Sequence, residues 1–269
     1  MRKFVPVFLV ILSLNIFGQN SNYETRGYGK TLLCDAGDFF QTGVDLIAQP
    51  FVWNGKDWLY FGGTLGATAA LFLIDEPVRD FALRNQSKTL DAIFSIDDWI
   101  TGARSLILPS AVYLYGFLAR NRSVRSLGLK FAEALIYASA ITFGLKIAFG
   151  RYRPYNEKGN LAFEPFTNKE ANASLPSGHA TAAFALATVF ASAYDNLYWE
   201  IFCYGAASVI AFARVYHDKH WASDIFLGSA IGYSVGKFVA NRKATTFQFG
   251  SVKISPYFSG ASFGVFGRF

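Results

Sequence analysis

The chain has 269 residues, of which 52% are hydrophobic, 17% aromatic and 16% charged. This apolar composition, with fewer charged residues than the roughly 25% usual in soluble domains, excludes a disordered or collagen-like chain. Lys and Arg number 25 against 19 Asp and Glu, a formal net charge of +6. No long run of like charges marks a nucleic-acid-binding arm, so nucleic acid is not an expected partner.

The N-terminus has the pattern of a secretory signal peptide. Arg2 and Lys3 precede an apolar stretch that ends before Gly18, as in a charged n-region followed by an h-region and a small residue. We therefore predict a signal peptide over residues 1–18 and an extracytoplasmic segment, polar and without strong periodicity, over residues 19–57. An uncleaved membrane anchor is the alternative, although the apolar stretch is shorter than the ~20 residues that span a bilayer.

Six apolar segments then follow, and their length and their Ala, Leu, Phe and Gly content favour helices over strands. They are residues 58–74, 105–119, 127–149, 180–194, 201–213 and 225–240. We therefore predict an all-α fold, a six-helix bundle within a helical domain of residues 58–243. The polar stretch of residues 155–175 between two of the helices is long enough for a functional loop.

The bundle is predicted to be embedded in a membrane, with a peripheral or soluble bundle as the alternative. Only residues 58–74 approach the length of an uninterrupted span. The loop with Arg120, Arg122 and Arg125 has no acidic residue and would face the cytoplasm by the positive-inside tendency. This orientation conflicts with the signal peptide unless one segment does not cross the membrane.

The last residues of the chain change character. Phe247 and Phe249, and then Val252 and Ile254, alternate with polar residues between Gly and Ser. Such alternation predicts β-strands. Residues 244–269 are therefore predicted to form a short β-hairpin appendage, to which we assign no function.

The three histidines, His179, His217 and His220, fall within 42 residues of one another. A pair of cations and a polar helix start lie in the same part of the chain. Titratable residues gathered in this way are typical of a functional site, so this part of the chain is the candidate site.

Lys146 and Arg153 are seven residues apart, which is two helical turns, so they are predicted to share a face at the end of the third helix. Pro154 biases Arg153 out of the helix and ends it. Arg offers a planar fork of donors and Lys a point charge, which together suit a phosphate group. Taken alone, these cations and Arg151 are more simply explained as the basic flank of an apolar helix.

The sequence Pro176-Ser177-Gly178-His179 opens the Ala-rich fourth helix. Ser177 suits an N-cap, and Gly178 lets a ligand approach the backbone. The free N–H groups of the first helical turn bind anions. A capping serine followed by an incidental histidine is the alternative for so short a motif.

His220 and Asp224 are four residues apart, one helical turn. The carboxylate can therefore hold one imidazole nitrogen and leave the other as a nucleophile, with Arg214 close by in the sequence. A structural histidine beside a helix-start aspartate is one alternative. A metal site of His217, His220 and Asp224 is another, but it leaves Arg214 and the other cations unexplained.

The order and spacing of these motifs are specific. Lys-x6-Arg-Pro from Lys146, Pro-Ser-Gly-His from Pro176 and Arg-x5-His-x3-Asp from Arg214 follow one another along the chain. This pattern resembles the three-part signature of the type 2 phosphatidic acid phosphatase superfamily, which includes lipid phosphatases, bacterial class A acid phosphatases and vanadium haloperoxidases. The resemblance covers residues 127–240, with Ala213 at a peripheral position where the family often has Ser.

The resemblance implies a role for each matching residue. The phosphoryl oxygens would be held by Lys146, Arg153, Arg214, Ser177 and the Gly178 amide. His220 would attack phosphorus to give a phosphohistidine, and Asp224 would orient it. His179 would protonate the leaving oxygen and then activate water. No cofactor and no metal is implied.

The predicted function is therefore a metal-independent phosphatase that hydrolyses a phosphate or diphosphate monoester. An apolar bundle with its site at a helix end suits a phosphorylated lipid, such as an undecaprenyl, phosphatidyl or lipid A phosphate. The expected location is a bacterial cell envelope, with the protein integral to the membrane and the site facing the periplasm. The alternatives are a soluble periplasmic acid phosphatase acting on small phosphate esters, a vanadium haloperoxidase and a non-catalytic helical membrane protein.

Overall fold

The computed structural model of the protein describes residues 27–95, 97, 102–242, 247–249, 252–258 and 263–268. The predicted signal peptide lies outside these residues. The chain divides into two compact units. The first unit comprises the chain up to Val52, Ser105–Glu133 and the chain from Asn241, and the second comprises Trp53–Arg104 and Ala134–Ala240.

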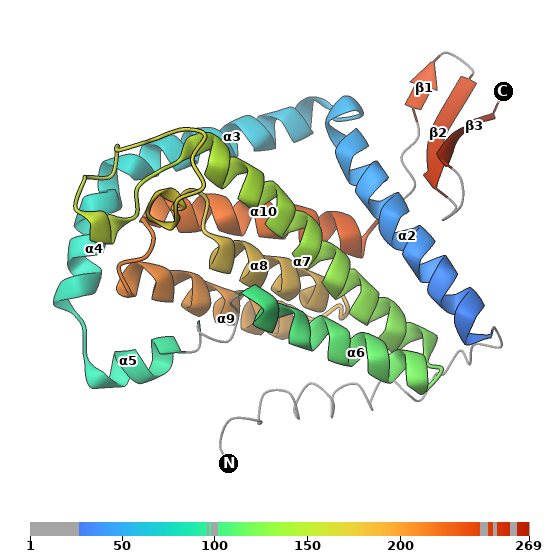
Figure 1. The fold of residues 1–269 in the computed structure, drawn as a ribbon, viewed down its shortest axis with the longest axis horizontal. Coiled ribbons are helices and arrows are strands. Elements are labelled where there is room, and N and C mark those ends of the chain that lie inside the picture. Colours follow the sequence, from blue (N-terminus) through green and yellow to red (C-terminus); the bar gives the residue numbers. More distant parts are fainter. Residues whose placement is uncertain are drawn as a thin grey trace. The chain divides into compact units, whose positions relative to one another are not determined.

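Helices dominate the described chain (Figure 1), which confirms the predicted all-α class. In chain order they are α2 (Tyr28–Ala48), α3 (Gly55–Leu71), α4 (Asp75–Arg84), α5 (Lys88–Phe94), α6 (Ile107–Leu118), α7 (Arg122–Phe149), α8 (Gly178–Ala191), α9 (Leu197–Tyr216) and α10 (Ala222–Ala240). Each predicted apolar segment falls mainly in one of them. The predicted count of six is not confirmed, because α2, α4 and α5 also form.

Helix α2 belongs to the first unit and lies in the segment where the sequence shows no strong periodicity. Its buried side chains are mostly polar. Asp35 accepts a hydrogen bond of 2.6 Å from the Tyr113 hydroxyl and forms an ion pair with Arg125. Thr42 donates to Glu133 Oε1 over 2.8 Å. Because the inward stripe is polar, a search for a buried apolar stripe misses this helix.

Within the described residues, two helical segments are long and apolar enough to cross a membrane: Gly55–Arg84, which contains α3 and α4, and Arg122–Phe149, which is α7. From the sequence only the first of them is expected as an uninterrupted span, because Lys130 interrupts the start of α7. Large apolar side chains on α3, such as Leu59, are exposed. Exposure of such residues is what a lipid-facing helix requires.

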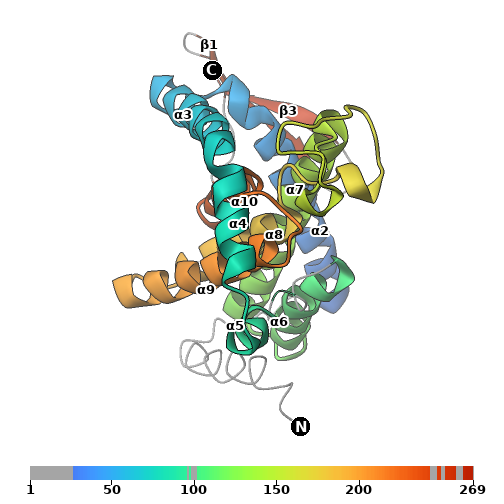
Figure 2. The same ribbon diagram turned by 90° about the vertical axis from the view of Figure 1, so that its left-hand side faces the viewer.

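In the second unit, α8 and α10 lie side by side (Figures 1 and 2). Gly228, Gly232 and Gly236 are buried at intervals of one turn along α10. A Cβ at Gly228 would lie 2.5 Å from the carbonyl oxygen of Ser177, and one at Gly232 would lie 2.3 Å from that of Thr181. Small residues at this spacing let two helices approach closely. They bring the beginning of α10 to the beginning of α8.

Gly228→Ala tests this close approach. We expect it to lower the free energy of unfolding by about 1–3 kcal/mol, because the new methyl group overpacks the contact with Ser177. Gly205→Ala in α9 is the matched control, since a Cβ there meets nothing within 4 Å. The control should be neutral or stabilising by up to about 1 kcal/mol, because Ala favours a helix over Gly. Unfolding in detergent measures both, and equal effects would contradict the packing argument.

The C-terminal segment contains three short strands in the order β1-β2-β3. β1 (Phe247–Phe249) pairs antiparallel with β2 (Val252–Phe258), which pairs antiparallel with β3 (Phe263–Arg268). Ile254 is opposite Phe247 on one side. The side chains of this segment lie outside the described part of the chain, and its separation as an appendage stays a prediction.

Candidate active site

The first motif lies at the C-terminal end of α7 and in the loop that follows. Lys146 is in the last turn of α7, and its Nζ donates to the carbonyl oxygens of Ala173 and Ser174. The helix ends at Phe149, so the prediction that Arg153 shares a helical face with Lys146 is wrong. Gly150 ends the helix with a φ of 57°, a left-handed conformation that favours glycine.

Arg153 instead reaches the site from extended backbone before Pro154. Its guanidinium is mostly buried, and Nη1 lies 3.4 Å from the exposed carboxylate of Glu170. Its Nε is buried and makes no hydrogen bond within the described chain. Lys146 lies within electrostatic reach of both Arg153 and Arg214, so the structure brings these three predicted phosphate ligands together.

The second motif begins α8. Ser177 is the predicted N-cap, and its side chain accepts a hydrogen bond from the Ala180 amide at 3.5 Å. Gly178 opens the helix, and Lys146 lies against it, because a Cβ on this glycine would be 3.9 Å from Lys146 Cε. His179 Nε2 is buried without a hydrogen-bond partner among the described residues.

The third motif spans the end of α9 and the start of α10. His220 is 2% exposed, and its Nδ1 lies 3.6 Å from Asp224 Oδ2, slightly beyond hydrogen-bond length. With Nδ1 turned to Asp224, Nε2 is the nitrogen left to act as a nucleophile. Burial lowers the pKa of His220 well below its usual range, which favours the neutral imidazole.

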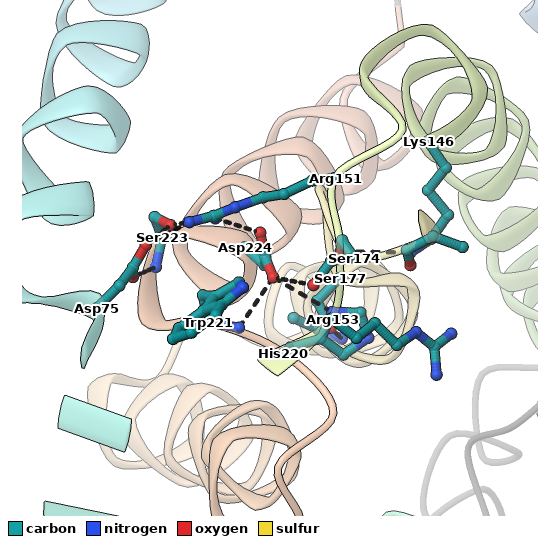
Figure 3. Close-up of polar contacts among 12 residues, drawn as sticks. Asp75, Lys146, Arg151, Arg153, Ser174, Ser177, His220, Trp221, Ser223 and Asp224 are labelled. Atoms are coloured by element: carbon teal, nitrogen blue, oxygen red, sulfur yellow. Dashed lines mark hydrogen bonds and ion pairs between the residues drawn. The ribbon is translucent and has the colours of Figure 1, made fainter. Parts of the chain in front are cut away.

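Asp224 is fully buried and held from several sides (Figure 3). Its Oδ2 accepts hydrogen bonds from the Trp221 amide at 2.8 Å and from the Ser174 hydroxyl. Its Oδ1 accepts from Arg151 Nη1 at 2.7 Å. Its own backbone carbonyl accepts from the Ser177 amide at 2.9 Å. The third motif is thereby fixed to the start of α8.

Arg214 pairs with an acidic residue that the sequence analysis missed. Arg214 Nη1 donates to Asp97 Oδ2, and His217 Nδ1 lies 3.2 Å from the same oxygen. His217 therefore contacts Asp97 in the structure. The described residues include no group of three or more His, Cys, Asp or Glu that could hold a metal ion, so the alternative metal ligands His217, His220 and Asp224 do not converge.

Arg151 is the second residue of the site that could not be predicted, because the basic flank of an apolar helix accounts for it in the sequence. Its side chain is fully buried and pairs with both Asp75 and Asp224. Asp75 is the first residue of α4 and is far from the motifs in the sequence. A signal for Arg151 was its place between the end of α7 and Arg153, but no spacing pointed to Asp75.

Several buried side-chain nitrogen atoms in the second unit have no hydrogen-bond partner among the described residues. In the described chain they include Arg153 Nε, Arg214 Nε, His179 Nε2 and His220 Nδ1. His179 lies within electrostatic reach of both arginines, and His220 within reach of Lys146 and Arg153. Buried polar groups are normally satisfied. Cationic donors left open beside a buried histidine are suited to an anion such as phosphate.

Comparisons with known proteins agree with this chemistry. Residues 127–247 match the model of the PAP2 superfamily. A lipid A 1-phosphatase of Porphyromonas gingivalis is 25% identical over 88% of this chain and 49% of its own length. A lipid A 1-phosphatase of Rhizobium etli is 28% identical over 63% of this chain and 77% of its own. The chain thus spans only about half the length of the Porphyromonas protein.

The fold has a counterpart among solved structures. A transmembrane PAP2-type phosphatidylglycerolphosphate phosphatase from Bacillus subtilis superposes with a TM-score of 0.53 and 21% identity, over 66% of this chain and 91% of that one. At this identity the likeness concerns the fold alone. Residues 127–247, the region that matches the PAP2 superfamily model, contain the three motifs in their expected order. This part of the chain is therefore similar to the PAP2 superfamily in sequence and in the order of its site residues.

Proposed function

We propose that the protein is a metal-independent phosphatase that hydrolyses a phosphate or diphosphate monoester of a lipid through a phosphohistidine on His220. The single observation that supports this most is a set of buried nitrogen atoms, Arg153 Nε, Arg214 Nε and His179 Nε2, that have no hydrogen-bond partner within the described residues. They lie in the same unit as the His220–Asp224 pair. Donors fixed in advance stabilise the charge that develops on a transferring phosphoryl group.

In the first step, His220 Nε2 attacks phosphorus in line and the bond from phosphorus to the ester oxygen breaks. Burial and the charge of Arg214 lower the pKa of His179 to about 3 in the free site, and the negative charge of a bound phosphate raises it again. His179 then gives a proton to the departing oxygen. Lys146, Arg153 and Arg214 hold the remaining phosphoryl oxygens, and the Ser177 hydroxyl and the Gly178 amide at the start of α8 add neutral donors. Asp224 stabilises the positive charge that forms on the attacking imidazole.

In the second step, His179 accepts a proton from water, and the resulting hydroxide attacks the phosphorus atom. The bond from phosphorus to His220 breaks, inorganic phosphate leaves, and His179 is protonated again for the next turnover. Neither step needs a group that this chain does not supply. The cycle therefore predicts turnover in the presence of a chelator.

A lipid substrate is supported by the apolar surface of the protein and by its relatives. Two helical segments can span a membrane, and the two relatives described above are named as phosphatases of lipid A. We propose that the protein is integral to a bacterial envelope membrane, with its site facing the periplasm. A phosphate headgroup would then enter the site while its acyl or prenyl chains stay in the bilayer.

Phosphate release by the purified protein tests the function. With EDTA present, we expect release from an undecaprenyl or phosphatidyl phosphate and a lower kcat/KM with p-nitrophenyl phosphate, because only the lipid also binds through its apolar chain. Equal kcat/KM values would indicate a non-specific acid phosphatase. Loss of release in EDTA alone would contradict the metal-independent mechanism, and no release from any of these esters would contradict a phosphatase.

A further inference from the structure

The carboxylate of Asp75 is fully buried at the beginning of α4 and satisfied by donors from two other segments. Its Oδ1 accepts from the Ser223 amide at 2.8 Å, and its Oδ2 accepts from the Ser223 hydroxyl at 2.6 Å. Oδ2 also accepts from Arg151 Nη2 at 2.6 Å. Asp75 thus contacts Ser223, which directly precedes Asp224 in the first turn of α10. It also contacts Arg151, which lies in the loop after α7.

Arg151 joins Asp75 to Asp224, as Figure 3 shows. Nη2 donates to Asp75 and to the Asn160 carbonyl oxygen, and Nε also donates to that oxygen at 2.9 Å. Nη1 donates to Asp224 at 2.7 Å and to the Ser223 hydroxyl at 2.7 Å. A guanidinium has five N–H donors, and this one directs all of its nitrogens at protein oxygens.

This full set of partners separates Arg151 from the arginines expected to bind phosphate. Arg153 and Arg214 each keep a buried Nε without a hydrogen bond in the described chain, whereas Arg151 has no nitrogen to spare for a substrate. The face of its guanidinium is also covered, because Cζ lies 4.4 Å from the centre of the Phe72 ring. Arg151 therefore acts on the reaction only through the groups that it contacts.

Of the groups that Arg151 contacts, Asp224 is the one that lies beside His220, the proposed nucleophile. Arg151 occupies Oδ1 of this carboxylate and leaves Oδ2 to face His220 Nδ1. A buried carboxylate paired with one arginine alone would have its charge largely cancelled. The second carboxylate, on Asp75, offsets the charge of Arg151, so the group of three carries a net negative charge toward His220.

We propose that Asp75 is a positioning residue of this site, which acts through Arg151 to orient Asp224 and to keep it an effective negative partner for His220. The inference rests on the proposed phosphatase function and extends it to a residue outside the three motifs. Asp75 touches neither the substrate nor His220. Its effect is therefore on the rate and on the protonation of His220, and not on the binding of phosphate.

The test is Asp75→Asn, with Asp80→Asn as the matched control. Asp80 is on the same helix, but its side chain is exposed and pairs with Arg84 one turn further along α4. For Asp75→Asn we expect a fall in kcat of about 10–100-fold, by analogy with the loss on removing a group that orients a ligand in a metal site, with KM within about twofold. The control should keep the wild-type kcat and KM.

The pH profile distinguishes positioning from a purely structural role. Removing the negative charge of Asp75 lowers the pKa of His220 further, so the acidic limb of kcat/KM should move to lower pH in Asp75→Asn. Orthovanadate resembles phosphate, so its binding stoichiometry, measured by calorimetry, gives the fraction of each variant that has an intact site. A loss of activity equal to the loss of vanadate sites, with an unmoved acidic limb, would overturn the positioning role. Unchanged kcat would do the same.

The two proposals fail in different ways. If the wild-type protein releases no phosphate, the proposed function is wrong. If the wild type turns over and Asp75→Asn matches it in kcat and in pH profile, only the role of Asp75 is wrong.

Discussion

Replacing His220 with alanine is expected to abolish phosphate release, because the variant lacks the nitrogen that forms the bond to phosphorus. His179→Ala should behave differently. It keeps the nucleophile and loses the general acid, whose contribution is typically 10²–10⁴-fold, so it should form the phosphoenzyme slowly. The two histidines thus have separable effects although both lie in the same unit.

A quenched reaction with a ³²P-labelled lipid phosphate separates the two effects. The wild type and His179→Ala should show labelled protein that is stable to alkali and lost in acid, as a phosphohistidine is, and His220→Ala should show none. Equal residual activity in the two variants would contradict this division of roles. Gly205→Ala serves as a folded control, because its position in α9 has open space around it.

The motifs could be located from the sequence because each is local. Ser177 caps α8 as expected from its place before an Ala-rich run. His220 and Asp224 face one another because one helical turn separates them. The six apolar segments also appear as helices, since continuous apolar runs of this length have few other folded forms. Local spacing determines these features, so they need no knowledge of the tertiary structure.

The rest of the site depends on contacts that spacing does not encode. Asp75 lies almost 150 residues before Asp224, and it meets the site only because α4 packs beside α10 in the second unit. Asp97 reaches Arg214 from another segment that carries no motif. In the first unit, α2 was missed because its buried residues, such as Asp35, are polar. A buried charge is recognisable only once its partner is known.

Arg151 is the buried charge whose role depends most on distant partners, Asp75 and Asp224. Of the substitutions proposed here, its removal should lower the free energy of unfolding the most. The side chain is fully buried between two fully buried carboxylates. Arg151→Met preserves much of the apolar volume and removes the charge, which leaves Asp75 and Asp224 buried without their shared cation. Breaking a buried ion pair from one side costs about 3–5 kcal/mol, because the remaining charge is uncompensated. We expect Arg151→Met to destabilise the protein by that amount.

Arg84→Met is the matched control for this change. Arg84 also pairs with an aspartate, Asp80, but its side chain is 77% exposed, and such surface pairs contribute about 1 kcal/mol or less. Denaturant unfolding in detergent measures both variants. The double variant Asp75→Asn with Arg151→Met should be less destabilised than the sum of the single changes, because the first change removes one of the two charges that the second leaves unpaired. Additive effects would show that Asp75 and Arg151 stabilise the fold independently, and would leave Asp75 without a route to Asp224.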